Sequence, residues 1–120
     1  MRIAAFGDKR LGVVGYDDTI VDITDVLQQY EPLGPEDMLP DLITHFEELK
    51  PELESKAATG GGTPLSETKL DSPVTRPTKI VCLMGNYREG TDRPLQKLDL
   101  FFKSPEGISG DGDTVVLPPH

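Results

Sequence analysis

Polar side chains follow two apolar runs in the last third of the chain. The first run covers residues 80–84 and the second residues 101–102, and each leads into a polar loop. Strands that carry polar loops at their ends are a common way to build a binding site on a rigid scaffold. Arginine can hold a carboxylate through two parallel hydrogen bonds, and lysine offers a point charge to a carboxylate oxygen. The candidate substrate-binding residues are Tyr87, Arg88, Lys103 and Ser104.

Two of the four candidates also have an ordinary structural interpretation. Tyr87 could be a packed aromatic residue whose hydroxyl is satisfied, and Arg88 a solvated charge or a salt-bridge partner. Lys103 is the better cationic candidate because two phenylalanines precede and position it, and Ser104 could donate a hydrogen bond nearby. Residues 89–97 are charged and contain glycine, so we expect a lid there. No catalytic residue is assigned.

Composition excludes several classes of partner. The 120 residues carry a formal net charge of -9, which disfavours nucleic acid and anionic lipid as partners. The single cysteine, Cys82, lies in an apolar run, so we expect a small buried hydrophobic residue and no disulfide within the chain. There is no apolar signal segment and no run near the ~20 apolar residues of a membrane span. We therefore expect a soluble, cytoplasmic protein.

The first part of the chain has the pattern of a small module of strands and helices. Residues 2–6, 11–16 and 19–23 predict an antiparallel meander with tight turns. Thr24 is the expected N-cap of a short helix over residues 25–30.

Apolar residues at helical spacing over residues 39–49 predict one amphipathic helix. His45 lies off its apolar stripe and is expected at the surface or boundary. Pro51 is expected to break or restart the helix.

A change in composition near residue 60, to glycine-rich and then proline-containing chain, suggests a domain boundary. Residues 59–64 contain three glycines and read as a flexible link, and residues 65–77 read as extended chain. No Lys-Ser or Lys-Thr pair follows the glycines, so a phosphate-binding loop is rejected. Later, the turn Gly110-Asp111-Gly112-Asp113 precedes a strand-like stretch, residues 114–117. The domains expected are residues 1–72 and residues 73–120.

Taken together, these segments resemble the fumarylacetoacetate hydrolase family, and the resemblance covers nearly the whole chain. The opening residues 1–14 are similar to the N-terminal module of bacterial members. Residues 73–82 look like the start of the catalytic domain, and 110–118 resemble its Gly-x-Gly-Asp turn and following strand. Asn86-Tyr87-Arg88 matches the Asn-Tyr signature, and residues 101–105 resemble the Phe-Phe-Lys-Pro segment.

The resemblance implies an α+β, strand-rich fold, in which a small β/α module precedes the first strands of a mixed β-roll. It implies an enzyme that hydrolyses, isomerises or decarboxylates 2-oxo acids or 1,3-dicarbonyl compounds through an enolate bound to Mg²⁺ or Mn²⁺. It also implies either a homodimer or a complementing C-terminal chain.

Two departures from the family pattern limit this inference. The Glu-x-Glu ligands and the further acidic ligand lie beyond residue 120 in the family, and Glu106, Asp111 and Asp113 do not match them, so no metal ligand is assigned in this chain. Hydrolytic members carry a His three positions after the tyrosine and an acid three further on, where this chain has Gly90 and Arg93. Without that general base, hydrolysis is in doubt.

Two other interpretations remain open. A family member without metal ligands could be a non-catalytic dimerisation or regulatory module, which would need its strand edges covered. The similarity could also be purely architectural, in a stand-alone β-rich domain. The meander and the helix are expected under all three interpretations, so they do not discriminate among them.

Overall fold

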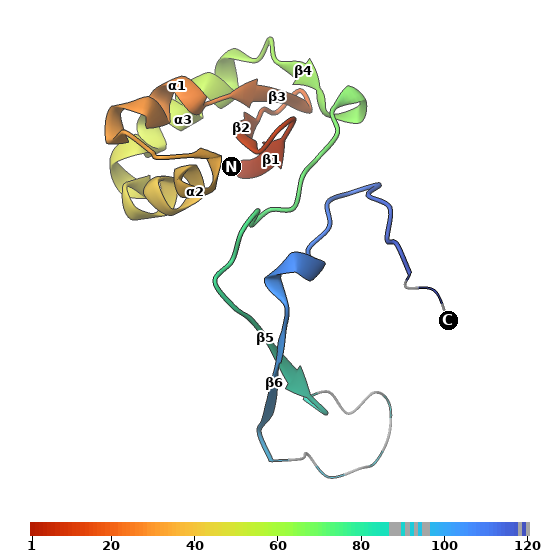
Figure 1. Ribbon diagram of the computed structural model, residues 1–120. Coiled ribbons are helices and arrows are strands. Elements are labelled where there is room, and N and C mark those ends of the chain that lie inside the picture. Colours follow the sequence, from red (N-terminus) through yellow and green to blue (C-terminus); the bar gives the residue numbers. More distant parts are fainter. Residues whose placement is uncertain (87–89, 91, 93, 95–96, 118, 120) are drawn as a thin grey trace. The chain divides into compact units, whose positions relative to one another are not determined.

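The chain folds as two compact units (Figure 1). The structure is a computed structural model and describes residues 1–86, 90, 92, 94, 97–117 and 119. The first unit comprises Met1–Thr75 and Ser109–His120, and the second comprises Arg76–Ile108. The chain therefore leaves the first unit, forms the second and returns. The division into domains at residue 72 remains a prediction.

An antiparallel sheet of order β1-β2-β3-β4 forms the base of the first unit. Its strands are β1 (Arg2–Phe6), β2 (Arg10–Val14), β3 (Thr19–Asp22) and the short β4 (Thr63–Pro64). The predicted meander is confirmed, with Ala5 opposite Leu11 and Val13 opposite Val21. Leu11 and Val13 face the helical layer, while Val14 and Ile20 are buried on the opposite face of the sheet.

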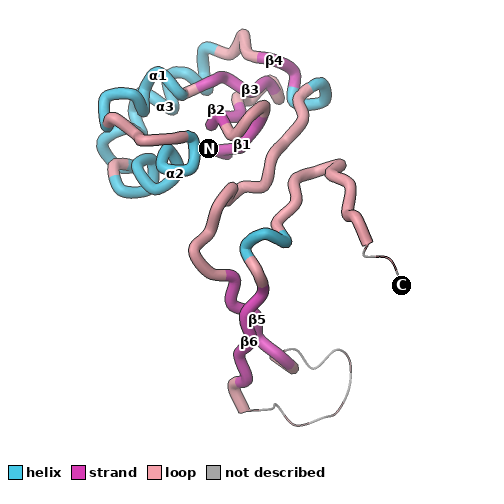
Figure 2. The backbone as a smooth tube through the Cα atoms, viewed as in Figure 1, coloured by secondary structure: helices cyan, strands magenta, loops and turns pink. Residues whose placement is uncertain are grey.

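Helices pack against the meander (Figure 2). They are α1 (Thr24–Leu27), which continues into the 3-10 turn η1 (Gln28–Tyr30), and the longer α2 (Pro35–Thr44) and α3 (Phe46–Thr59). Strand and helix residues together make one apolar core. Its buried members are Ala5, Leu11, Val13, Ile23, Val26, Leu27, Met38, Leu42, Leu49, Leu53 and Ala57.

The prediction of one helix over residues 39–49 is wrong, because two helices meet at His45. The backbone of His45 has φ -106° and ψ 17°, outside the helical region, so it is both the C-cap of α2 and the N-cap of α3. Leu42 and Leu49 of the predicted stripe are buried, but Ile43 is 67% exposed. Leu39 and Phe46 pack against the same core, so the apolar stripe faces the core on both sides of the break even though the helix does not continue through it.

Two predictions about helix ends are also wrong. Pro51 lies inside α3, which continues to Thr59. Thr24 is the first residue of α1 and makes no side-chain cap; its Oγ1 is buried without a partner among the described residues. The N-cap position is Ile23, and Oδ1 of Asp22 accepts a hydrogen bond of 2.8 Å from the amide of Thr24.

The glycine-rich link is part of the sheet. Thr63 pairs with Ile20 of β3, and the 3-10 turn η2 (Leu65–Glu67) follows β4. A Cβ on Gly62 would overlap the carbonyl oxygen of Ile20, so the close approach of the two backbones requires glycine.

The second unit is built on a β-hairpin. Strands β5 (Ile80–Met84) and β6 (Asp99–Lys103) pair antiparallel, and the 3-10 turn η3 (Pro105–Gly107) follows. Residues 114–117 of the first unit do not form the predicted strand. The fold is thus mixed α and β, as expected, and the description of the hairpin as the start of a β-roll remains a proposal.

Candidate functional site

Lys103 is the last residue of β6 and is exposed. It pairs with Ile80 at the first position of β5. Its ammonium lies 5.9 Å from the ring centroid of Phe101, within the range of a cation–π contact. Because alternate residues of a strand share a face, Phe101 supports Lys103 as the sequence suggested. The charge has no ion-pair partner among the described residues, so it is available to an anion.

Ser104 has a structural role that was not predicted. It is the N-cap of η3, and its Oγ accepts a hydrogen bond of 3.3 Å from the amide of Glu106. The cap uses the hydroxyl as an acceptor and leaves its proton free to donate. The cap therefore holds the Ser104 hydroxyl, a possible hydrogen-bond donor, directly after Lys103 at the end of β6.

The other two candidates, Tyr87 and Arg88, lie outside the residues that the structure describes, as does most of the expected lid. Their contribution stays a prediction. The glycines that flank them have the expected left-handed backbone, with φ 61° at Gly85 and 72° at Gly90.

An apolar surface accompanies these residues on the hairpin. Directly opposed residues of an antiparallel pair point to the same face. Val81 faces Phe102 and Leu83 faces Leu100, and these side chains are 46–69% exposed. Cys82, on the other face, is half-buried rather than buried as predicted. The face formed by Val81, Leu83, Leu100 and Phe102 is called the apolar hairpin face below.

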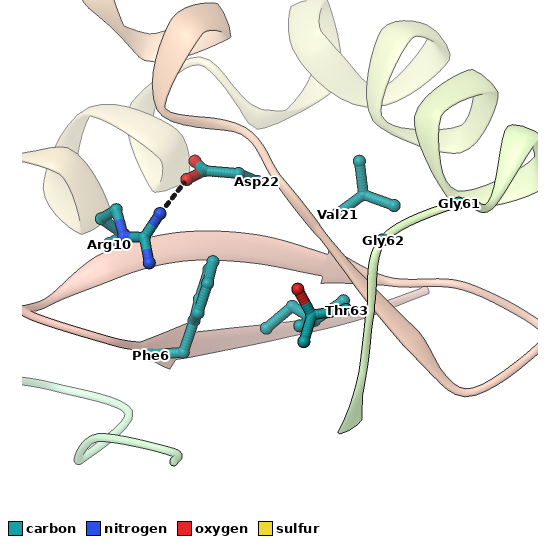
Figure 3. Close-up of a pocket in the computed structure, with 8 residues that line it drawn as sticks. Phe6, Arg10, Val21, Asp22, Gly61, Gly62 and Thr63 are labelled. Atoms are coloured by element: carbon teal, nitrogen blue, oxygen red, sulfur yellow. Dashed lines mark hydrogen bonds and ion pairs between the residues drawn. The ribbon is translucent and has the colours of Figure 1, made fainter. Parts of the chain in front are cut away.

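A cavity of about 410 Å³ lies in the first unit, beside the point where β4 joins the sheet (Figure 3). Phe6 and Ile20 form its apolar part, and both are buried. The Arg10 guanidinium stacks 4.6 Å above the ring centroid of Phe6 and donates to the Asp22 carboxylate at 2.9 Å.

This cavity offers no obvious chemistry. Nη1 of Arg10 donates to Asp22 and Nε donates to the carbonyl of Gly7, and Asp22 in turn accepts from the amide of Thr24, the first residue of α1. The pair is therefore part of the fold. The pairing of β2 and β3 places Arg10 and Asp22 on one face of the sheet, because Asp22 is opposite Gly12, two residues after Arg10.

No metal centre is present among the described residues. They contain no cluster of three or more His, Cys, Asp or Glu side chains that could hold an ion. Asp113 accepts from Lys69 and from the amide of Gly110, and Glu106 is exposed on η3. The donor set of the described residues therefore does not fit a divalent cation.

Comparison with known proteins gives consistent matches, although no protein-family model matches the chain. Maleylpyruvate hydrolase of Aquipseudomonas alcaligenes is 31% identical over 98% of this chain and 46% of its own length. Human mitochondrial oxaloacetate tautomerase FAHD2A is 34% identical over 78% of this chain and 31% of its own length. A Pongo abelii relative at the same identity is a fumarylacetoacetate hydrolase domain-containing protein.

The chain belongs to the fumarylacetoacetate hydrolase family. The crystal structure of maleylpyruvate hydrolase from Sphingobium sp. SYK-6 with manganese(II) and pyruvate superimposes with a TM-score of 0.76 at 33% identity. The match covers 98% of this chain and 42% of that one. The chain thus spans less than half the length of these members of the family. No helix within the described residues is long and apolar enough to cross a membrane.

Proposed function

We propose that this chain forms part of a divalent-metal-dependent enzyme that acts on 2-oxo acids or 1,3-dicarbonyl compounds. The observation that carries the proposal is the match, over 98% of the chain, to a maleylpyruvate hydrolase solved with manganese(II) and pyruvate. Mg²⁺ or Mn²⁺ would act as a Lewis acid that stabilises an enolate. Because the described residues do not fit such an ion, its ligands would lie on polypeptide outside these residues.

In this proposal, the chain contributes groups that bind and orient the substrate. The exposed ammonium of Lys103 would attract the substrate carboxylate, and the hydroxyl proton of Ser104 would donate to an oxygen of the same molecule. Tyr87 and Arg88 would add a phenol and a guanidinium from the preceding loop. A bound 2-oxo acid would then be held by its carboxylate, with the oxo group left for the metal.

The choice of reaction follows from Gly90. It stands where hydrolytic members of the family carry a histidine, and a glycine cannot activate water as a general base. We therefore place isomerisation or decarboxylation ahead of C–C bond hydrolysis. The relatives bear names of both kinds, hydrolase and tautomerase.

The proposed partners follow from the same match. The other part of the active site would come from a complementing C-terminal polypeptide, either continuous with this chain or separate, and the assembly would be a homodimer. The apolar hairpin face supports an assembly of this kind, because exposed apolar patches mark interaction surfaces. A cytoplasmic location remains a prediction.

A non-catalytic dimerisation or regulatory module is the second candidate. Two observations favour it: the described residues lack a metal cluster, and the hairpin exposes its apolar face. Under this alternative, Lys103 and Ser104 would have structural roles only.

Mass spectrometry of the purified protein, followed by Mn²⁺ titration and assay of oxaloacetate enolisation, tests the proposal. We expect a longer polypeptide or a second chain, metal binding and activity. In the complete enzyme, Lys103→Met should raise KM for the 2-oxo acid by about tenfold, whereas Lys79→Met, an exposed lysine of the same unit, should not. If the purified species is this chain alone and neither binds metal nor turns over substrate, the module takes the place of the enzyme.

A further inference from the structure

Residues 69–72 lie along the free edge of β1. The amide of Asp71 donates to the carbonyl of Ala5 at 2.8 Å, and Phe6 forms a β-bridge with Leu70. The carboxylate of Asp71 also accepts from the amide of Lys9 at 3.0 Å, in the turn that follows β1. This segment, which leads toward the second unit, is therefore fixed to the sheet by backbone hydrogen bonds.

The segment that returns from the second unit packs on the same place. A Cβ on Gly110 would lie 3.0 Å from the carbonyl oxygen of Leu70 and 3.1 Å from both Asp71 Cα and the amide nitrogen of Ser72. These neighbours are backbone atoms, which cannot move aside as the end of a flexible side chain can. A side chain at position 110 would therefore force the two segments apart by a few tenths of an ångström.

An ion pair joins the two segments. Lys69 Nζ lies 2.7 Å from one carboxylate oxygen of Asp113, and the other oxygen accepts from the amide of Gly110 at 2.7 Å. The hydrogen bond from Lys69 lowers the pKa of Asp113, and the same bond raises the pKa of Lys69. Both groups are therefore charged across the neutral range, and ionic strength, rather than pH near neutrality, controls the attraction.

We propose that residues 109–113 form a strap that the Lys69–Asp113 ion pair closes onto residues 69–72, and that the closed strap stabilises the β5–β6 hairpin. An isolated two-stranded hairpin is at best marginally stable in water. Tying the chain together before and after the hairpin removes loop-closure entropy from its unfolded state. The strap therefore stabilises strands that it does not need to touch. This inference does not depend on the proposed enzymatic function.

Two substitutions remove the ion pair from either side. Lys69→Met removes the ammonium, and Asp113→Asn removes the charge but keeps a side-chain oxygen for the amide of Gly110. Lys50→Met, at an exposed lysine of α3, is the matched control. NMR of the 120-residue chain would follow nuclear Overhauser contacts between Gly110 and Ser72, and amide hydrogen exchange in β5 and β6.

We expect both variants to weaken the Gly110–Ser72 contacts and to speed exchange in the hairpin roughly two- to fivefold, as suits an exposed ion pair. The double variant should match either single variant, because they remove the same interaction. In about 1 M salt, wild type should approach the variants. The control should behave as wild type, with exchange in β2 and α3 unchanged throughout.

Gly110→Ala tests the packing of the strap without changing any charge. Its control is Gly107→Ala, since nothing lies within 4 Å of a Cβ at Gly107. We expect amide exchange in β5 and β6 to be about tenfold faster in Gly110→Ala than in wild type, and unchanged in the control. The proposal is overturned if the hairpin exchanges at the wild-type rate in Lys69→Met, Asp113→Asn and Gly110→Ala. It also fails if the Gly110–Ser72 contacts disappear while the hairpin stays equally protected.

Discussion

The imidazole of His45 stacks on the phenol ring of Tyr30, with ring centroids 4.0 Å apart and planes 14° apart. His45 is the residue at which α2 ends and α3 begins, so the stack ties the helix junction to the end of the first helical segment. Nδ1 of His45 also lies 3.7 Å from a carboxylate oxygen of Glu48. The geometry gives His45 a packing role, in line with the boundary position expected from the sequence.

Replacement of Tyr30 by Phe should make the chain more resistant to alkaline unfolding. Burial raises the pKa of Tyr30 above its usual 10.0, and the charges of Glu48, Asp41 and Glu52 add to this. The folded state therefore holds a proton that the unfolded state releases, so the stability contributed is complete below pH 10 and is lost as pH rises through the folded pKa.

Urea unfolding at about pH 7 and about pH 11 measures this effect. When the pH rises from the lower value to the higher, the free energy of unfolding should fall less for Tyr30→Phe than for wild type. Tyr16→Phe, at a side chain that is 95% exposed, should follow wild type. Equal losses for wild type and Tyr30→Phe would mean that the hydroxyl is not withheld from water in solution.

Truncation to alanine should destabilise the chain strongly at Leu53 and hardly at all at Ile43, although both are apolar residues of helices. Leu53 is fully buried in the core, so Leu53→Ala should lower the free energy of unfolding by about 2–5 kcal/mol. Ile43 is 67% exposed, so Ile43→Ala should change the free energy of unfolding by less than about 0.5 kcal/mol. Chemical denaturation measures both. A large loss for Ile43→Ala would support the single continuous helix instead.

The strength of local patterns decided what the sequence could predict. The strands of the meander are short apolar runs separated by turn residues, so their positions and antiparallel pairing follow from the chain itself. The break at His45 does not, because the apolar spacing from Leu39 to Leu49 passes through it without interruption. Tertiary packing against Tyr30, which no local pattern records, accompanies the break.

The candidate site was predictable in part for the same reason. The apolar pair before Lys103 predicted that Lys103 and Ser104 enter a loop, whereas Lys103 is the last residue of β6 and Ser104 follows it; their role at a site remains a prediction. The capping role of Ser104 could have been read from the Pro105-Glu106 that follows, since serine before proline often starts a helical turn. The strap could not be predicted from the sequence, because Lys69 and Asp113 are distant along the chain and come together only in the folded structure.

Gly62→Ala should destabilise the first unit, because the new Cβ would overlap the carbonyl oxygen of Ile20. The neighbour is backbone in the sheet, so the strands would have to separate, and we expect a loss of about 1–3 kcal/mol in the free energy of unfolding. Gly107→Ala, which meets nothing within 4 Å, is the control. An unchanged thermal midpoint for Gly62→Ala would show that β4 can leave the sheet at little cost.

If the proposed homodimer forms through the apolar hairpin face, Phe102→Ser should weaken it without destabilising the first unit. Phe102 is 69% exposed and lies opposite Val81 on the apolar hairpin face, where a polar side chain removes apolar area that a partner would bury. Sedimentation equilibrium would measure the association constant, and exchange of core amides in β2 would report the first unit. Leu33→Ser is the control, since Leu33 is 99% exposed in the first unit, away from the hairpin in sequence. If Phe102→Ser associates as strongly as wild type, the apolar hairpin face is not the surface through which two copies of the chain bind each other.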